Sequence, residues 1–374
     1  MHVAHLALHD FRSYQSVEFD LEPGSTAFIG ANGQGKTNLV EAIDYVATLG
    51  SHRVSNDTPL VRANSDHAVI RAKVVRGDRT ALLEVEITPG KANRARINKS
   101  QLPRNRDIVG VLRTVLFSPE DLALVKGDPS DRRRFLDALL VLQTPRLGGV
   151  KADYDRILRQ RNTLLKSAGR RRDVELTTLD IWDDNLAKVG GELMAERFAL
   201  LEALAPFLAE AYVQVAAQAA GDRQAATAVY KPSFHVEPES HDAESLRLAL
   251  LAELVVRRRD ELDRGVSLVG PHRDEVTLTL GDLPAKGYAS HGESWSFALA
   301  LKLASFELLR ADGDDPVLIL DDVFAELDLG RREQLATLVA DAEQVLVTAA
   351  VADDVPAGLV GHRFRVGDGK VICD

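Results

Sequence analysis

The spacing of hydrophobic and polar positions changes twice along the chain. Up to about residue 128, short segments alternate between apolar and polar residues, as β-strands with one buried face do. From residue 129 to about 264, apolar residues recur at helical spacing, and from residue 265 short strand-like segments return. The pattern predicts an α/β unit in two parts, 1–128 and 265–374, with a mainly helical lobe, 129–264, inserted between them.

Individual elements can be placed within these parts. The expected strands are His2–Leu8, Val17–Leu21, Ser25–Ile29, Val69–Val75, Ala81–Thr88, Val276–Leu280, Val317–Leu320, Gln344–Thr348 and a terminal His362–Cys373 segment. The expected helices are Arg132–Leu142, Lys151–Ser167, Leu179–Gln218, Glu244–Arg264 and Trp295–Arg310. Pro206 should kink or divide the third of them. No heptad pattern is long enough for an extended coiled coil, and no internal repeat is visible.

A glycine-rich loop follows the strand expected at Ser25–Ile29. Residues Gly30–Thr37 read Gly-Ala-Asn-Gly-Gln-Gly-Lys-Thr, the G-x-x-x-x-G-K-[ST] spacing of a phosphate-binding P-loop. Because a helix follows directly, backbone N–H groups and a positive helix end would point at one spot, where a triphosphate would lie. The alternative is a glycine turn whose lysine is solvated. The loop predicts ATP and Mg²⁺ as cofactors, and the expected nucleotide contacts are Gly30, Asn32, Gly33, Gly35, Lys36, Thr37 and Asn38.

Two acids end the apolar strand expected at Val317–Leu320. Asp321 would enter the Mg²⁺ shell beside the Thr37 hydroxyl, and Asp322 would orient or deprotonate the attacking water. The alternative is a core strand that ends in a solvated acidic turn. With Lys36 on the β- and γ-phosphates, the predicted catalytic residues are Lys36, Asp321 and Asp322.

A second possible phosphate site lies just before this strand. Ser290 and Gly292 open a strongly helical segment, and a Ser-x-Gly sequence at a helix N-terminus can bind a phosphate. Because the P-loop would already bind the phosphates of one nucleotide, we expect this second phosphate site to contact the nucleotide of another subunit. The sequence therefore predicts Ser290 and Gly292 as nucleotide contacts across a dimer.

The order of these motifs resembles the head of an ABC-type ATPase. P-loop, long insertion, Ser-x-Gly, acidic strand end and Glu-Leu-Asp at 326–328 follow one another as they do in that class, in which two heads enclose two ATP molecules. Within the class, the chain is similar to the RecF family of DNA-repair proteins. The motifs that carry this likeness span almost the whole chain: Asp10–Tyr14, Asn32–Ile43, Ser51–Arg53, Leu116–Leu122, Arg133–Asp137, Gln160–Lys166, Gly270–Asp274 and Ala298–Ala304.

The resemblance implies an ATP-dependent homodimer that binds duplex DNA next to single-strand gaps. With RecR and RecO it would help to place RecA at such gaps, and a slow, DNA-stimulated hydrolysis of ATP would reset the dimer. It also implies that Arg12 packs near the nucleotide base, that Glu120 is a further Mg²⁺ residue, and that Thr348 occupies a γ-phosphate-sensing position. The alternatives are that Arg12 supports the first strand and that Glu120 is an acid at a helix start.

Three positions depart from the related pattern. In the S-x-G-Q-x-[RK] sequence that the family usually carries, Glu293 replaces the glutamine and Trp295 stands where a basic residue is expected. An acid near the γ-phosphate of the partner would weaken ATP-driven dimerisation. The second acid after the strand is Asp322, where most ABC transporters have glutamate, and the shorter side chain favours slow turnover.

The distribution of charged residues indicates which part of the chain could bind DNA. A net charge of −10 argues against indiscriminate polyanion binding and requires a localised basic face. One stretch of the helical lobe carries seven basic residues with no acid among them, and the alternative is a solvated helical face. Its members are Arg156, Arg159, Arg161, Lys166, Arg170, Arg171 and Arg172. Because no aromatic ladder accompanies them, backbone contact with duplex DNA is favoured and sequence specificity is not expected.

The remaining composition excludes several classes. The single cysteine, Cys373, excludes a disulfide framework and a cysteine-rich zinc site. No leader and no run of about 20 apolar residues is visible, so we expect a soluble, cytoplasmic protein without a membrane partner.

A transporter motor subunit would carry L-S-G-G-Q, which residues 290–293 do not supply. A cytosolic P-loop kinase or metabolic ATPase would need neither the Ser-x-Gly loop nor a basic lobe, and a long-armed SMC protein is excluded by length.

Overall fold

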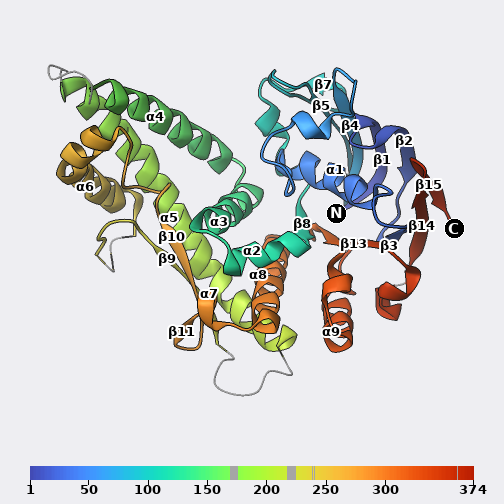
Figure 1. Cartoon of the computed structure of the whole chain (residues 1–374). Helices are drawn as coiled ribbons and strands as arrows, with labels where there is room; N and C mark the ends of the chain where they lie inside the picture. The colour runs from blue at the N-terminus through green and yellow to red at the C-terminus, as the bar shows by residue number, and fades with distance from the viewer. Residues whose placement is uncertain (169–175, 217–224, 238, 240, 360) are drawn as a thin grey trace. The chain divides into compact units, whose positions relative to one another are not determined.

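The computed structural model describes residues 1–168, 176–216, 225–237, 239, 241–359 and 361–374. Backbone contacts divide the chain into two compact units (Figure 1). Unit 1 comprises Met1–Leu122, Glu210–Ala220 and Ser290–Asp374, and unit 2 comprises Ala123–Ala209 and Gly221–Ala289. The sequence pattern predicts the second boundary after residue 264, whereas this division places it after residue 289. The reason is that β10 (Glu275–Leu280) pairs with β9 (Ala226–Lys231), which belongs to unit 2.

Unit 1 contains two six-stranded sheets. The first is antiparallel, with the order β2-β1-β4-β5-β6-β7, and the second has the order β15-β14-β3-β13-β12-β8. The strands of the first are β1 (His2–Phe11), β2 (Tyr14–Asp20), β4 (Ala68–Arg76), β5 (Arg79–Ile87), β6 (Arg94–Ile97) and β7 (Ser100–Gln101). Those of the second are β3 (Gly24–Ile29), β8 (Thr114–Phe117), β12 (Val317–Asp321), β13 (Gln344–Ala349), β14 (His362–Gly367) and β15 (Lys370–Cys373).

The second sheet is parallel except for β15. Every residue of β12 and β13 is buried, as expected for central parallel strands covered on both faces. Helix α1 (Lys36–Thr48) contacts strands of both sheets and is buried over most of its surface. It therefore lies in the core of unit 1, with its N-terminus at the end of β3.

The other helical segments of unit 1 lie mainly in its C-terminal part. They are α8 (His291–Ala311), α9 (Leu329–Val339) and the short η1 (Thr58–Leu60), η2 (Asn105–Ile108), η3 (Pro119–Asp121), η4 (Val323–Glu326), η5 (Ala352–Asp354) and η6 (Ala357–Leu359). Helix α8 has fourteen buried residues over its length, among them Trp295. It is thus a core helix of unit 1 and not a surface one.

Unit 2 is mainly helical, as the sequence predicts. It contains α3 (Pro129–Gln143), α4 (Leu147–Ala168), α6 (Ala243–Arg264), the short α7 (Ala285–Tyr288) and most of α5 (Leu176–Val215), while the short α2 (Leu122–Lys126) begins at its boundary. A three-stranded antiparallel sheet, β11-β10-β9 with β11 at Leu283–Pro284, completes it. Strand β9 was missed, because its segment reads as a polar connector. Pro206 lies inside α5 and does not divide it, so that alternative is wrong.

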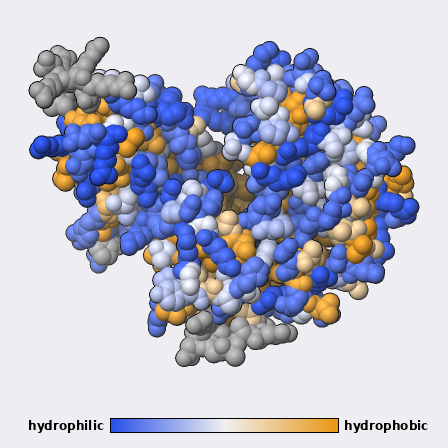
Figure 2. Space-filling view, in the orientation of Figure 1, coloured by the Kyte–Doolittle hydropathy of each residue, from blue (hydrophilic) through white to orange (hydrophobic). Residues whose placement is uncertain are grey.

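Helix α5 is also the one described helix that is long and apolar enough to cross a membrane, over Thr178–Val215. Length and composition alone are weak support for a span, because the core helix of a water-soluble protein passes the same test. Arg197 in the middle of α5 is buried and forms an ion pair with Asp137 of α3, at 2.8 Å. The face seen in Figure 2 is mostly hydrophilic, with hydrophobic residues in separate small patches. We therefore interpret α5 as a core helix.

Candidate nucleotide site

The glycine loop Gly30–Thr37 connects β3 to α1, and its glycines are required by sterics. A Cβ at Gly30 would lie 2.1 Å from the Val366 carbonyl oxygen of β14. Gly35 has φ +103°, and a Cβ there would lie 2.9 Å from Ser13 Oγ and from the Tyr14 hydroxyl oxygen. The loop therefore fits against both β14 and the β1–β2 turn only with glycine at these positions.

Lys36 is the first residue of α1 and its side chain turns back into the loop. Its Nζ donates to the carbonyl oxygens of Gly30, at 2.8 Å, and Ala31, at 3.3 Å. The residue is only 3% exposed, so the ammonium group is held inside the loop curve. An ammonium group at this place can exchange the carbonyls for phosphate oxygens.

Thr37 and the strand end of β12 meet, although they are 284 residues apart in sequence. The Thr37 hydroxyl donates to Asp321 Oδ1 at 2.9 Å, and the Thr348 hydroxyl of β13 donates to the same oxygen at 2.6 Å. Asp321 and Thr348 are paired residues of the parallel β12–β13 register, which explains the second contact. The structure thus joins the P-loop, the acidic strand end and Thr348 at one carboxylate.

Asp322 follows in a left-handed conformation, with φ 51° and ψ 19°. Its backbone N–H donates to Thr348 Oγ1 at 2.9 Å. Burial, and next the neighbouring carboxylate of Asp321, raise the pKa of Asp322 above its ordinary value, while Lys36 opposes the shift. Asp322 lines a cavity of about 270 Å³ together with Asn32, Pro119, Phe324, Ala325, Glu326, Thr348, Ala349, Ala350 and Asp354. A carboxylate with a raised pKa beside a P-loop is suited to accept a proton from water.

A divalent ion would find part of its ligands here. Among the residues that the structure describes, no three His, Cys, Asp or Glu side chains group into a ready-made cation site. Mg²⁺ in proteins is commonly held by one or two carboxylates together with substrate phosphates and water. Thr37 and Asp321 fit this requirement, since their oxygens lie side by side at the loop. Glu120 lies exposed in η3, and its part in Mg²⁺ binding remains a prediction.

Arg12 and Asn38 lie on the outer side of the loop. Arg12 donates from Nε and Nη2 to the two carboxylate oxygens of Glu41, at 2.8 and 2.5 Å. Asn38 donates to Ser13 Oγ at 2.9 Å and accepts from Arg53 Nη1 at 3.1 Å. Arg12 is thus paired with α1, and its contact with the nucleotide base remains a prediction.

Sequence reasoning missed two residues of this neighbourhood, Glu41 and His52. Glu41 lies on α1, is fully buried, and accepts from Arg12 and from Ser51 Oγ at 2.5 Å. His52 Nε2 lies 3.8 Å from Asp321 Oδ2, and both ring nitrogens are buried without a hydrogen bond to any residue that the structure describes. Burial would lower the pKa of His52, but the carboxylates of Asp321 and Asp44 outweigh it and raise the pKa. The only sequence signal was their place inside the family motifs 32–43 and 51–53.

Ser290 and Glu293 form a capping box at the start of α8. Ser290 Oγ accepts from the Glu293 backbone N–H at 3.2 Å, and the Ser290 backbone N–H donates to Glu293 Oε2 at 2.7 Å. The acid at position 293 therefore has a structural role in holding the helix start. Trp295 is 3% exposed and points into the core, so it does not take the place of an exposed basic residue.

The seven basic residues predicted to contact DNA do not behave alike. Arg156, Arg159 and Lys166 are exposed on α4. Arg170, Arg171 and Arg172 lie outside the described residues. The prediction is wrong for Arg161, which is fully buried.

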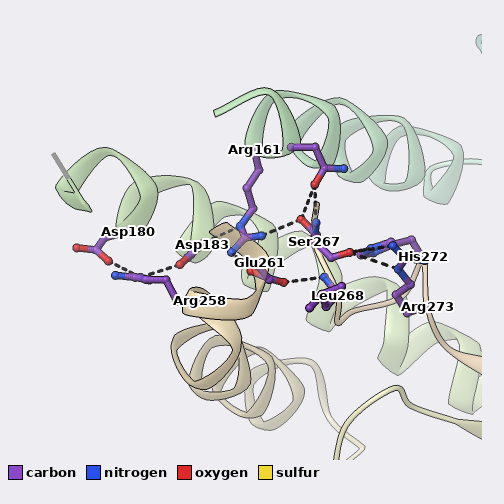
Figure 3. Close-up of polar contacts among 10 residues, drawn as sticks. Arg161, Asp180, Asp183, Arg258, Glu261, Ser267, Leu268, His272 and Arg273 are labelled. Carbon is purple, nitrogen blue, oxygen red and sulfur yellow. Dashed lines mark hydrogen bonds and ion pairs between the residues drawn. The ribbon is translucent and has the colours of Figure 1, made fainter. Parts of the chain in front are cut away.

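Arg161 is instead the centre of a buried ionic cluster of unit 2 (Figure 3). It donates to Asp183 Oδ1 at 2.6 Å, to Glu261 Oε2 at 2.6 Å and to Ser267 Oγ at 2.8 Å. Arg258 binds the other Asp183 oxygen at 2.8 Å. The cluster ties α4, α5 and α6 to the segment after α6, and it leaves no part of Arg161 for DNA.

Three features define the head of an ABC-type ATPase: a glycine P-loop between β3 and α1, the acidic end of β12, which is separated from β3 by β13, and a capped serine loop before α8. The family described as the RecF/RecN/SMC N terminal domain matches residues 2–357. The DNA replication and repair protein RecF of Nocardioides sp. is 61% identical, covering 100% of this chain and 99% of its own. RecF of Streptomyces avermitilis is 60% identical, with 99% of each chain covered.

A solved structure of the recombination mediator protein RecF with ATP, in the RecFOR pathway, superimposes with a TM-score of 0.90 and 28% identity. It covers 100% of this chain and 97% of that one. An Smc head bound to the C-terminal winged-helix domain of ScpA matches with a TM-score of 0.55 and 16% identity, which shows the fold alone. The chain belongs to the RecF family, and the family and fold class predicted from its sequence are confirmed.

Proposed function

We propose that the protein is an ATP-gated DNA-binding recombination mediator. It dimerises on ATP, binds duplex DNA next to single-strand gaps and, with RecR and RecO, helps to load RecA there. The observation that carries the proposal is the shared carboxylate of Asp321, which joins the P-loop residue Thr37 to Thr348 across 284 and 27 residues of sequence. This places a metal-binding type of carboxylate next to the P-loop, and a solved RecF structure with ATP shares the fold.

ATP is the nucleotide that this site fits. Gly30, Gly33 and Gly35 keep the loop open to phosphates, and Lys36 can exchange its two carbonyl partners for β- and γ-phosphate oxygens. Thr37 and Asp321 would hold Mg²⁺, which supplies charge neutralisation on the phosphates. Asn32 lines the cavity beside Asp322, and Asn38 is fixed by Ser13 at the outer side of the loop.

Hydrolysis would be slow. Asp322 is the proton acceptor that we assign to the attacking water, and its side chain is one methylene shorter than glutamate. The shorter carboxylate holds the attacking water less well, and we infer a weak ATPase with the slow turnover that a clamp with a long-lived closed state requires. That DNA increases the rate is the part of this proposal that comes from the resemblance to the RecF family.

Closure would bring Ser290 and Gly292 of one subunit onto the ATP of the other. The hydroxyl of Ser290 already caps the N-terminal backbone of α8, a helix of 21 residues whose N-terminus carries a partial positive charge. Exposed Arg156, Arg159 and Lys166 supply a local basic face on a chain of charge −10. RecR and RecO are proposed as partners because the solved relative is described as part of the RecFOR pathway. RecA as a further partner and the cytoplasm as the setting come from the resemblance of the sequence to the RecF family.

Sedimentation tests the dimer directly. The protein is run with Mg²⁺ alone, with ATP and with ATP plus a duplex that carries a single-strand gap. Dimers only with ATP, reinforced by the gapped duplex, are expected. Ser290→Arg should abolish the dimer by placing a bulky side chain at the subunit contact.

Ser290→Asp is the matched control for folding. Aspartate is as good a helix N-cap as serine, so α8 keeps its start, but its carboxylate repels the partner's γ-phosphate. This variant should bind ATP as a monomer and fail to dimerise. A wild-type protein that stays monomeric with ATP and DNA would refute the clamp.

A further inference from the structure

The serine loop, Ser290–Glu293, lacks the basic residue that the related pattern carries, but a basic side chain from another helix lies against this loop. Trp295, at the expected position of the base, is buried in the core. Arg331, from α9, lies over the loop instead. A Cβ at Gly292 would stand 2.8 Å from Arg331 Nη2, 3.2 Å from Nη1 and 3.4 Å from Cζ. The guanidinium thus lies against the glycine backbone, and glycine at position 292 makes room for it.

Arg331 forms an ion pair with Asp328. Its Nη1 donates to Asp328 Oδ2 at 2.7 Å, while the other oxygen of Asp328 accepts from the Arg331 backbone N–H at 3.0 Å and caps α9. The Arg331 side chain is 33% exposed, and a guanidinium has five donors in a planar fork. Donors on the open side of the group are available to an anion that approaches the loop.

The neighbouring Arg332 has a different arrangement. Its Nε donates to the Leu327 carbonyl oxygen at 2.9 Å, and its Nη1 donates to Asp354 Oδ1 at 3.2 Å. Arg332 therefore braces the segment before α9. Only the first of the two adjacent arginines faces the serine loop.

Two carboxylates lie near the serine loop, so an anion could bind there only if a cation offset their charge. Glu293 carries a negative charge within the capping box, and Asp328 carries another beside Arg331. Without Arg331, a triphosphate from a partner would meet two carboxylates and only the partial positive charge of a helix end. With Arg331 it meets a full, bidentate cation.

We propose that Arg331 is the phosphate-binding cation of the serine loop and contacts the γ-phosphate of the ATP bound by the partner subunit. On closure the guanidinium exchanges its Asp328 contact for phosphate oxygens, and Asp328 keeps its capping role. The inference rests on the proposed two-head arrangement and deepens it. It also explains how a loop with Glu293 can serve ATP-driven dimerisation.

Two variants separate this role from simple packing, since they change charge in opposite directions. Arg331→Gln keeps a long polar side chain over Gly292 but removes the cation. Asp328→Asn keeps a good helix N-cap but removes the competing anion. Arg331→Lys keeps a charge without the planar fork. Arg71→Ala is the matched control, because Arg71 is also a partly exposed, ion-paired arginine of unit 1, bound to Glu84 within the antiparallel sheet.

The measurement is the dimer dissociation constant by sedimentation equilibrium with Mg²⁺ and ATP, and again with ADP. Arg331→Gln should raise the constant in ATP about 100-fold, because one charge-assisted contact is lost at each of two sites. Arg331→Lys should fall between it and the wild type, and Asp328→Asn should lower the constant. Arg71→Ala should match the wild type.

Two further readouts decide the interpretation. The preference for ATP over ADP should shrink in Arg331→Gln, since only ATP offers a γ-phosphate, and the affinity of the monomer for ATP should not change. An Arg331→Gln dimer as tight as wild type in ATP, or Asp328→Asn weakening the dimer, overturns the inference and leaves the proposed function intact. A wild-type chain that never dimerises with ATP overturns both.

Discussion

At the scale of single residues, Asp322 shows why an aspartate stands at the proposed water site. Its backbone has φ 51°, a left-handed conformation that aspartate, asparagine and glycine adopt more readily than other residues. The turn lets its N–H reach Thr348 while the carboxylate lines the cavity beside Asn32. The backbone geometry therefore favours a short acid, and a short acid favours slow hydrolysis.

The variant Asp322→Glu tests whether the short side chain limits the rate of hydrolysis. A longer carboxylate should hold the attacking water better, so the single-turnover rate of ATP hydrolysis is expected to rise several-fold. The left-handed backbone should make the variant less stable by roughly 1 kcal/mol, visible as a lower melting temperature. A fall in the rate would contradict the proposed role of side-chain length. Asp322→Asn, which suits the same backbone but cannot accept the proton, should abolish turnover.

At the scale of elements, helix α4 shows both what the sequence could predict and what it could not. The seven basic residues suggested one face, yet Arg161 belongs to the buried stripe of the helix with Tyr154, Ile157 and Leu165. That three- and four-residue spacing was visible in the sequence and would have separated Arg161 from Arg159. The acids that neutralise it come from α5 and α6, and their approach depends on tertiary packing.

The P-loop, in contrast, was predictable because its parts do not depend on tertiary packing. Strand, glycines, lysine and helix are contiguous at residues 25–48, so local pattern is enough to place them. The contact of Asp321 with Thr37 required the topology of the parallel sheet, which the motif order supplied. Ser290 and Glu293 form the Ser-x-x-Glu signature of a capping box, but comparison with the related pattern presented Glu293 as a defect. The capping box was therefore predictable from the local sequence, whereas the effect of Glu293 on dimerisation remains a prediction.

The buried cluster of α4 yields a stability prediction with an internal control. Arg161→Ala leaves Asp183 and Glu261 buried near each other without their common partner, which should lower the stability of unit 2 by about 3–5 kcal/mol. Arg159→Ala, an exposed change two positions earlier on the same helix, should alter it by less than about 0.5 kcal/mol. Urea unfolding followed by circular dichroism measures both. Equal midpoints for the two variants would show that the cluster is not a major stabilising element.

At the scale of the whole molecule, the acidic net charge and the proposed DNA function are compatible only through local separation of charge. The ionic cluster around Arg161 neutralises arginines in the interior, whereas Arg156, Arg159 and Lys166 remain on the surface of α4. Arg156 is partly engaged by Asp153 at 3.2 Å. Binding through so few contacts per subunit should depend on the dimer, which doubles their number, and on low salt.

The dependence of DNA affinity on salt therefore measures this face. If about 4–6 phosphates are neutralised across the dimer, the log–log slope of affinity against salt is roughly −4 to −5. Removing Arg159 and Lys166 together deletes about four contacts from a dimer, so the slope should become shallower by about 3–4, at an unchanged dimer constant in ATP. The matched control replaces exposed Arg79 and Lys91 of unit 1 and should leave the slope as it is. If the α4 variant and the control gave the same slope as the wild type, phosphate contact would have to lie elsewhere on the chain, and α4 would serve only to carry the buried cluster.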